Sequence, residues 1–243
     1  MKRGVCVITG GGRGIGAATA RRAAAEGWTV CLSYRSDEVA ARAVADEIGG
    51  QAVHAEVTDE ATIERLFDNA VEMGPITAVV ANAGIVAPTS ALADMDVDRM
   101  RRMLDVNVLG VMLTARAAIR HMSTERGGQG GGLVLVSSAA ARLGSPGQYV
   151  DYAASKGAID TLTLGLAKEV AAEGIRVNAV RPGIIDTEIH ASAGHPDRPA
   201  QVGSQLPLGR AGTADEVAAA VVWLLGDDAS YLAGSILDIA GGR

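Results

Sequence analysis

Short apolar segments alternate along the chain with longer segments in which apolar residues recur every three or four positions. The short segments are predicted strands, at residues 4–9, 28–34, 51–57, 76–82, 133–138, 175–180 and 234–239. The longer segments are predicted helices, at residues 14–27, 37–48, 59–73, about 96–122, about 149–173 and 213–226. The last helix opens with a capping box formed by Thr213 and Glu216.

This alternation predicts an α/β fold. Apolar runs of strand length separated by amphipathic helices are typical of a parallel sheet that helices cover on both faces. We therefore expect residues 1–243 to form one doubly wound, Rossmann-type domain with about seven strands. The exception is an irregular insertion at about residues 188–205, rich in Gly, Pro and Ser. Long segments of this kind are typically functional loops or disordered.

Composition and charge disfavour several classes of protein. The net charge of −6 and only seven aromatic residues disfavour nucleic acid as a partner. No apolar run reaches the length of a membrane span, and the first residues do not resemble a signal peptide, so we expect a cytoplasmic protein. Cys6 and Cys31 are expected to be reduced core residues, and His190 and His195 lack neighbouring ligands, so no metal site is predicted.

A glycine-rich segment joins the first strand to the first helix. It reads Thr9-Gly10-x-x-x-Gly14-Ile15-Gly16, which is neither a Walker loop nor G-x-G-x-x-G. Glycines allow a tight turn and a close approach of the backbone, and a helix N-terminus offers free N–H groups to a pyrophosphate. A turn that binds no ligand is the alternative.

Twenty residues beyond Gly14, dinucleotide-binding folds place an acid for the ribose 2′-hydroxyl. This chain has Tyr34, Arg35 and Ser36 there, and Arg13 lies inside the glycine segment. Two guanidinium groups without a competing acid suit a 2′-phosphate, so we expect a preference for NADP(H), with NAD(H) also possible. The alternative is that both arginines are solvated surface charges.

Further segments, in order, resemble the single-domain branch of the short-chain dehydrogenase/reductase family over essentially the whole chain. The glycine segment matches that family's cofactor loop, and Ala81 to Gly84 match its Asn-Asn-Ala-Gly element except at the first residue. The segment 181–187 resembles the one that holds the nicotinamide. The resemblance implies a catalytic set of four residues: Asn107, Ser138, Tyr152 and Lys156.

The spacing of Tyr152 and Lys156 suits proton transfer. Residues four apart on a helix share one face. A phenol is an effective proton donor near neutral pH only if its pKa falls well below about 10, and a nearby ammonium, helped by an oxidised nicotinamide, would favour that fall. Tyr149 has Ala153 at the corresponding position, so we expect it to line the substrate pocket or to pack.

Ser138 and Asn107 are assigned supporting roles. Ser138 stands at the carboxyl end of a strand, where its hydroxyl can hold the substrate carbonyl oxygen, and the neighbouring Ser137 should point the other way. Asn107 interrupts an apolar helical run, and the resemblance implies that it holds a water in a proton relay to the lysine. The alternative for Ser138 is that its hydroxyl caps a turn. The alternative for Asn107 is that its side chain makes a buried polar contact and has no part in proton transfer.

The resemblance also implies further cofactor contacts. Glu56 and Val57 would bracket the adenine, although the family usually has Asp at the first of these positions. The adenosine ribose would contact Asn82, Ala83 and Gly84, and Lys156 would bond the nicotinamide ribose beside Tyr152. The nicotinamide would be bordered by Pro182, Gly183, Ile185 and Thr187.

These observations predict an NADP(H)-dependent oxidoreductase that interconverts a small ketone and a secondary alcohol. A 3-oxoacyl-[acyl-carrier-protein] reductase is an alternative, which Glu173 disfavours because an acidic carrier calls for a basic residue near the pocket mouth. A dinucleotide-binding regulator without turnover is a second alternative. The resemblance also implies a homotetramer formed through the helices at about 106–122 and 149–173.

Overall fold

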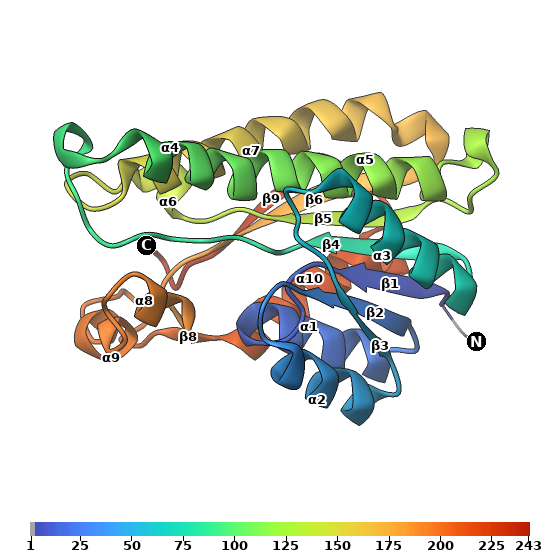
Figure 1. Cartoon of the computed structure of the whole chain (residues 1–243), viewed down its shortest axis with the longest axis horizontal. Coiled ribbons are helices and arrows are strands. Elements are labelled where there is room, and N and C mark those ends of the chain that lie inside the picture. Colours follow the sequence, from blue (N-terminus) through green and yellow to red (C-terminus); the bar gives the residue numbers. More distant parts are fainter. Residues whose placement is uncertain (1–2) are drawn as a thin grey trace.

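The computed structural model describes residues 3–243 and contains one large parallel sheet (Figure 1). Its strand order is β3-β2-β1-β4-β5-β6-β9. The strands are β1 (Val5–Ile8), β2 (Thr29–Tyr34), β3 (Gln51–His54), β4 (Ile76–Ala81), β5 (Gly131–Val136), β6 (Ile175–Pro182) and β9 (Ile236–Ile239). Every neighbouring pair in the sheet is parallel. The predicted seven-stranded α/β fold is confirmed.

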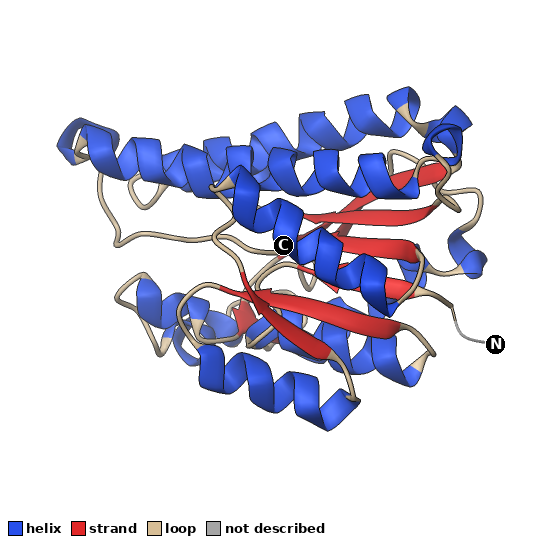
Figure 2. Ribbon diagram, turned by 45° about the vertical axis from the view of Figure 1, so that its right-hand side comes forward, coloured by secondary structure: helices blue, strands red, loops and turns tan. Residues whose placement is uncertain are grey.

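Helices cover both faces of this sheet (Figure 2). One face packs against α3 (Glu60–Met73), α5 (Gly110–Met122) and α7 (Val150–Glu169). The other packs against α1 (Gly14–Ala25), α2 (Glu38–Ile48) and α10 (Ala214–Leu225). The buried strands are rich in Val, Ile, Leu and Ala because both of their faces lie in the core. The capping box predicted for α10 is present, with Thr213 and Glu216 bonded reciprocally.

The predicted long helix at 96–122 is interrupted. It consists of α4 (Val97–Leu104), a π-helical turn (Asp105–Leu109) and α5. The turn contains Asn107, and π-turns within α-helices occur frequently at functional sites. Periodicity does not reveal such a turn because its residues continue the helical pattern.

The segment 188–205 is not irregular throughout. It contains two short helices, α8 (Ile189–Ser192) and α9 (Arg198–Gly203), and a two-stranded ribbon of β7 (Ile185–Asp186) and β8 (Gly212–Thr213) flanks it. Another four-residue helix, α6 (Ala140–Leu143), follows β5. No helix in the described residues 3–243 is long and apolar enough to cross a membrane.

The strand order determines where a ligand can bind. Chain connections run outward in both directions from β1 and β4, which makes this pair the switch point of the sheet. In open parallel sheets, a crevice forms at the carboxyl ends of the strands at such a point. The glycine segment after β1 and the segment after β4 lie there, and the start of α1 faces the same crevice.

Candidate functional site

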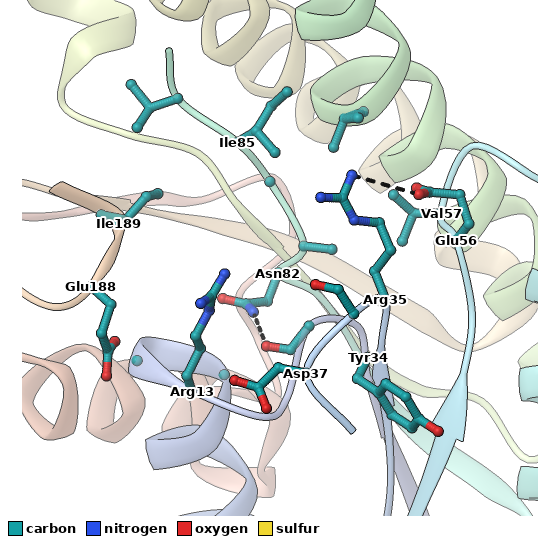
Figure 3. Close-up of a pocket in the computed structure, with 18 of the residues that line it drawn as sticks. Arg13, Tyr34, Arg35, Asp37, Glu56, Val57, Asn82, Ile85, Glu188 and Ile189 are labelled. Carbon is teal, nitrogen blue, oxygen red and sulfur yellow. Dashed lines mark hydrogen bonds and ion pairs between the residues drawn. The ribbon is translucent and has the colours of Figure 1, made fainter. Parts of the chain in front are cut away.

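A cavity of about 890 Å³ lies at the carboxyl ends of β1, β2 and β4 (Figure 3). Ligand-binding clefts typically measure about 300–1,000 Å³. The cavity brings together most of the cofactor-binding residues expected from the sequence: Gly10, Arg13, Gly14, Ile15, Gly16, Tyr34, Arg35, Ser36, Glu56, Val57, Asn82, Ala83, Gly84 and Thr187. The other expected cofactor-binding residues, Tyr152, Lys156, Pro182, Gly183 and Ile185, do not line it. Pro182 and Ile185 are buried, and Ile185 pairs with Gly212 in the small ribbon.

The glycine segment can accept no side chain at its tightest points. A Cβ on Gly16 would lie 2.2 Å from the carbonyl oxygen of Gly10, and Gly10 itself has φ of +66°. The segment is braced from β4, since the Asn82 amide donates to the carbonyls of Thr9 and Gly10 at 2.9 and 3.0 Å. The Asn82 side chain therefore holds the loop, and the ribose contact that the resemblance implies for this residue stays a prediction. The resulting cradle of exposed backbone fits a dinucleotide pyrophosphate.

Charged side chains gather at the β2 end of the cavity. Figure 3 shows Arg13 and Arg35 there with Asp37 and Glu56, and Arg35 forms an ion pair with Glu56 at 3.7 Å. No acid stands at residues 34–36, as the sequence shows, but two carboxylates from beyond that segment line the same end of the cavity. Asp37 is engaged as the cap of α2, accepting a hydrogen bond from the Ala40 amide. Tyr34 packs its ring against His54 at 5.5 Å.

Tyr152 and Lys156 lie on the first two turns of α7. The Lys156 side chain is buried, its Nζ donates to the Val136 carbonyl at 2.7 Å, and Nζ lies 5.8 Å from the centre of the Tyr152 ring. Ser138 follows the end of β5, where its hydroxyl is close enough to Tyr152 to influence the pKa of the phenol and accepts a hydrogen bond from the Ala140 amide at 3.1 Å. The turn-capping contact, which was the alternative for Ser138, is thus present. Ser137 is buried on the other side and donates to Asp160.

The pKa of Tyr152 is raised, although the sequence led us to expect Lys156 to lower it. Burial favours the neutral phenol, and the nearby Ser138 hydroxyl offsets this effect only in part. Burial also lowers the pKa of Lys156 to about 8, against the opposing influence of the nearby Asp160 carboxylate. The protein groups alone therefore do not produce the predicted acidified phenol.

Asn107 is fully buried in the π-helical turn. Its Oδ1 accepts from the Ile85 amide at 2.8 Å, and its Nδ2 donates to the Ile85 carbonyl at 2.9 Å and to the Ser155 hydroxyl at 3.1 Å. These bonds hold the segment after β4 against α7. Gly84 lies between Asn107 and Lys156, since a Cβ there would be 3.2 Å from Oδ1 and 3.5 Å from Nζ. Of the four residues expected to be catalytic, Asn107 and Lys156 thus lie against the cavity wall at Gly84, and none of the four lines the cavity itself.

Two largely buried ion pairs, which the sequence did not reveal, support this end of the site. Arg99 of α4 donates to the Asp151 carboxylate from Nε at 2.9 Å and from Nη2 at 3.2 Å, and its Nη1 donates to the Pro88 carbonyl at 2.6 Å. Arg181 of β6 bonds Asp160, which lies one turn after Lys156. The only signal in the sequence was position: Asp151 directly precedes Tyr152, and Asp160 follows Lys156 by four residues.

Tyr149 stands at the N-cap of α7, with its ring edge-on to Tyr152 at 6.0 Å between centres. It therefore lies beside the tyrosine expected to be catalytic, as predicted for a residue that lines a pocket or packs. Among the described residues, no group of three or more His, Cys, Asp or Glu side chains could hold a metal ion.

Comparison with known proteins identifies the family. Residues 10–243 match a family model described as enoyl-(acyl carrier protein) reductase. The chain is 50% identical over 246 residues to the uncharacterized oxidoreductase YgfF of Escherichia coli, covering 98% of this chain and 99% of that protein. It is 39% identical over 249 residues to 3beta-hydroxysteroid dehydrogenase 1 of Eggerthella lenta, covering 100% and 94%.

A solved structure of a short-chain dehydrogenase/reductase from Mycobacterium marinum superposes with a TM-score of 0.91 at 36% identity, covering 99% of this chain and 95% of that one. The sequence match, the structural match and the seven-stranded parallel sheet agree with one another. The chain belongs to the short-chain dehydrogenase/reductase family and is an oxidoreductase of that family.

Proposed function

We propose that the chain interconverts a ketone and a secondary alcohol with NADP(H), using Tyr152 as general acid and base. The observation that carries this proposal is that Tyr152, Ser138 and Lys156 lie together, with the Lys156 ammonium against the cavity wall at Gly84. The name of the Eggerthella lenta relative, a hydroxysteroid dehydrogenase, supports a secondary alcohol as the reacting group.

Each of these side chains has a role in moving one proton. The Tyr152 hydroxyl donates to the carbonyl oxygen in reduction and accepts from the alcohol in oxidation. Ser138 bonds the same oxygen and holds it near the phenol. Lys156 keeps two ammonium protons beyond the one bonded to the Val136 carbonyl, and these serve the nicotinamide ribose and the relay to Tyr152. Asn107 holds the relay water through the second lone pair of Oδ1.

The cavity fits a nicotinamide dinucleotide. Gly10, Gly14 and Gly16 would receive the pyrophosphate, and Glu56 and Val57 would border the adenine. When bound, the dinucleotide supplies the hydride at C4 and, when oxidised, a positive charge that favours the phenolate over the burial effect. Arg13 and Arg35 support NADP(H) because both guanidinium groups lie at the β2 end of the cavity.

The experiment is replacement of Tyr152 by Phe, which removes one oxygen atom and keeps the ring. We expect kcat for reduction of a panel of uncharged ketones with NADPH to fall at least about 1,000-fold, in the range expected when general acid catalysis is removed. The Kd for NADPH, measured by fluorescence titration, should change less than about threefold. Substantial residual kcat would refute the assignment of Tyr152.

A carrier-protein substrate is the second candidate, because the matching family model is described as an acyl-carrier-protein reductase. Glu173 lies in a one-turn helix directly before the start of β6, at the edge of the sheet away from the cavity, and its Oε2 is buried, so this residue does not decide between the two candidates. Comparing acetoacetyl thioesters with simple ketones under the same conditions discriminates the two.

A homotetramer formed through α5 and α7 belongs to the same proposal. Both helices keep large apolar side chains exposed, among them Leu109 and Met112 at the start of α5 and Leu164 on α7. Exposed apolar patches on a folded chain commonly mark interfaces.

A further inference from the structure

Arg198 of α9 reaches the catalytic end of the site from the segment 188–205. Its guanidinium lies 5.6 Å from the centre of the Tyr149 ring, and its Nη2 donates to the Gln148 side chain at 2.8 Å. Tyr149 in turn contacts Tyr152 edge-on at 6.0 Å. One aromatic ring thus separates this cation from the phenol proposed to transfer the proton.

Arg198 does not line the cavity of Figure 3, but the residues around it contact the segment that does. Residues 85–88 line the cavity, Thr89 approaches His195 at 3.4 Å, and the Ser90 amide donates to the Gln148 carbonyl at 2.8 Å. The segment 188–205 therefore meets the segments after β4 and before α7 directly beyond the cavity wall. Figure 1 shows α8 and α9 at the end of the molecule where α6 lies and α7 begins.

The charge of Arg198 is not balanced within the described part of the chain. No carboxylate of residues 3–243 forms an ion pair with it. Its Nε is buried and has no hydrogen-bond partner in the same residues. By contrast, Arg99 and Arg181, which are also largely buried at this end, are paired with Asp151 and Asp160.

A buried N–H without a partner and a half-buried cation without a counter-charge are both costly. A carboxylate satisfies both needs when its two oxygens bond Nε and Nη2, since they match the fork of N–H donors on a guanidinium. The Gln148 oxygen is neutral and bonds only Nη2, so it satisfies neither need. Only the Tyr149 ring lies between Arg198 and Tyr152. A substrate that reaches both residues must therefore have only a few atoms between its carboxylate and its reacting carbonyl carbon.

We infer that Arg198 binds a carboxylate group on the substrate, which makes the substrate class a small oxo acid and the corresponding hydroxy acid. This inference rests on the function proposed above and adds the charged group by which the substrate is recognised. The carboxylate lies against Arg198 while the carbonyl oxygen lies against Tyr152 and Ser138, and Tyr149 packs against the spacer between them.

The test compares 4-oxocyclohexanecarboxylate with 4-oxocyclohexanecarboxamide, two ketones of nearly equal shape that differ in charge. With NADPH, the wild-type kcat/KM for the carboxylate should exceed that for the amide at least about tenfold, the range expected for one charge-assisted hydrogen bond. Arg198→Gln should lower this preference about tenfold or more, mainly through KM. Arg198→Lys, which keeps the charge but loses the fork, should lie between the two.

Arg210→Gln is the matched control, because Arg210 follows the same segment but is exposed and already paired with Glu216. It should leave the carboxylate preference unchanged. Calorimetric titration of Tyr152→Phe with cyclohexanecarboxylate and cyclohexanecarboxamide in the presence of NADPH gives a readout that needs no turnover. Only the carboxylate should bind with an affinity that Arg198→Gln weakens in that background.

The outcomes separate the two proposals. Equal losses for carboxylate and amide in Arg198→Gln would reduce Arg198 to a residue that fastens the segment to α7, and would overturn the inference. Equal wild-type activity on both ketones would overturn it as well, while leaving the ketone reductase intact. Failure of the wild type to reduce any ketone in the panel would instead reject the proposed function, and the inference with it.

Discussion

At the scale of single residues, the proposed preference for NADP(H) depends mainly on Arg35. It lies at the β2 end of the cavity, and its ion pair with Glu56 at 3.7 Å is long and half-exposed, so that a phosphate can replace the carboxylate. We predict that Arg35→Gln lowers kcat/KM with NADPH about 10- to 100-fold and changes kcat/KM with NADH less than about threefold.

Steady-state kinetics with both dinucleotides checks this prediction. Arg42→Gln is the control, since Arg42 lies on the neighbouring helix α2, is paired with Glu38 and does not line the cavity. An equal loss with both dinucleotides, or a wild-type preference for NADH, would contradict the assignment of Arg35 to a 2′-phosphate.

Contacts between residues could be predicted from the sequence where both residues lie on the same helix or strand, because their spacing along it determines how close they are. Tyr152 and Lys156 lie on one helix, and their four-residue separation was enough to expect them close together. Contacts could not be predicted in this way where distant segments meet. Asn82 braces a loop 72 residues away, and Glu56 reaches Arg35 from the end of another strand. Such pairs depend on strand order, which the hydrophobic pattern does not specify.

At the scale of elements, one ion pair joins α4, α7 and the segment after β4. The side chains of Arg99 and Asp151 are only 14% and 6% exposed, and Arg99 also bonds the Pro88 carbonyl. Removing one member of a buried pair leaves the other charge uncompensated, which costs about 3–5 kcal/mol. We predict that Arg99→Gln lowers the free energy of unfolding by about 3 kcal/mol.

Guanidinium chloride denaturation measures this loss. Arg42→Gln again provides the comparison, because its pair with Glu38 is exposed and should contribute only about 0.5 kcal/mol. A loss below about 1 kcal/mol for Arg99→Gln would show that α4 and α7 are held together by apolar packing alone.

The elements themselves were largely predictable, because burial on one or both faces imposes the periodicity of each strand and helix. The exceptions have physical causes. The π-turn around Asn107 keeps the apolar pattern of a helix while changing its hydrogen bonds, and α8 and α9 lie in a segment whose Gly, Pro and Ser content favours turns. Both exceptions border the site. In these segments, polar contacts with other parts of the chain outweigh the secondary structure that the local sequence favours.

At the scale of the whole molecule, the exposed apolar side chains of α5 and α7 predict the assembly. Leu164 is 48% exposed on α7 and Met112 is 48% exposed on α5. Figure 1 shows α5 and α7 in the same outer layer, on the opposite side of the sheet from α1 and α2. Because an interface that buries these side chains removes apolar surface from water, we predict that this layer forms an interface between chains, and the family resemblance makes a homotetramer the expected assembly.

Light scattering coupled to size-exclusion chromatography tests the assembly on wild type and on Leu164→Glu. The glutamate would place a charge in the apolar contact, so the variant should elute with a smaller mass than the tetramer while its far-UV circular dichroism is unchanged. Val39→Glu serves as control, since Val39 is 81% exposed on α2, outside the α5–α7 layer, and should leave the mass at four chains. If Leu164→Glu also remains a tetramer, the assembly uses another face, and the exposed residues of α5 and α7 need a different explanation.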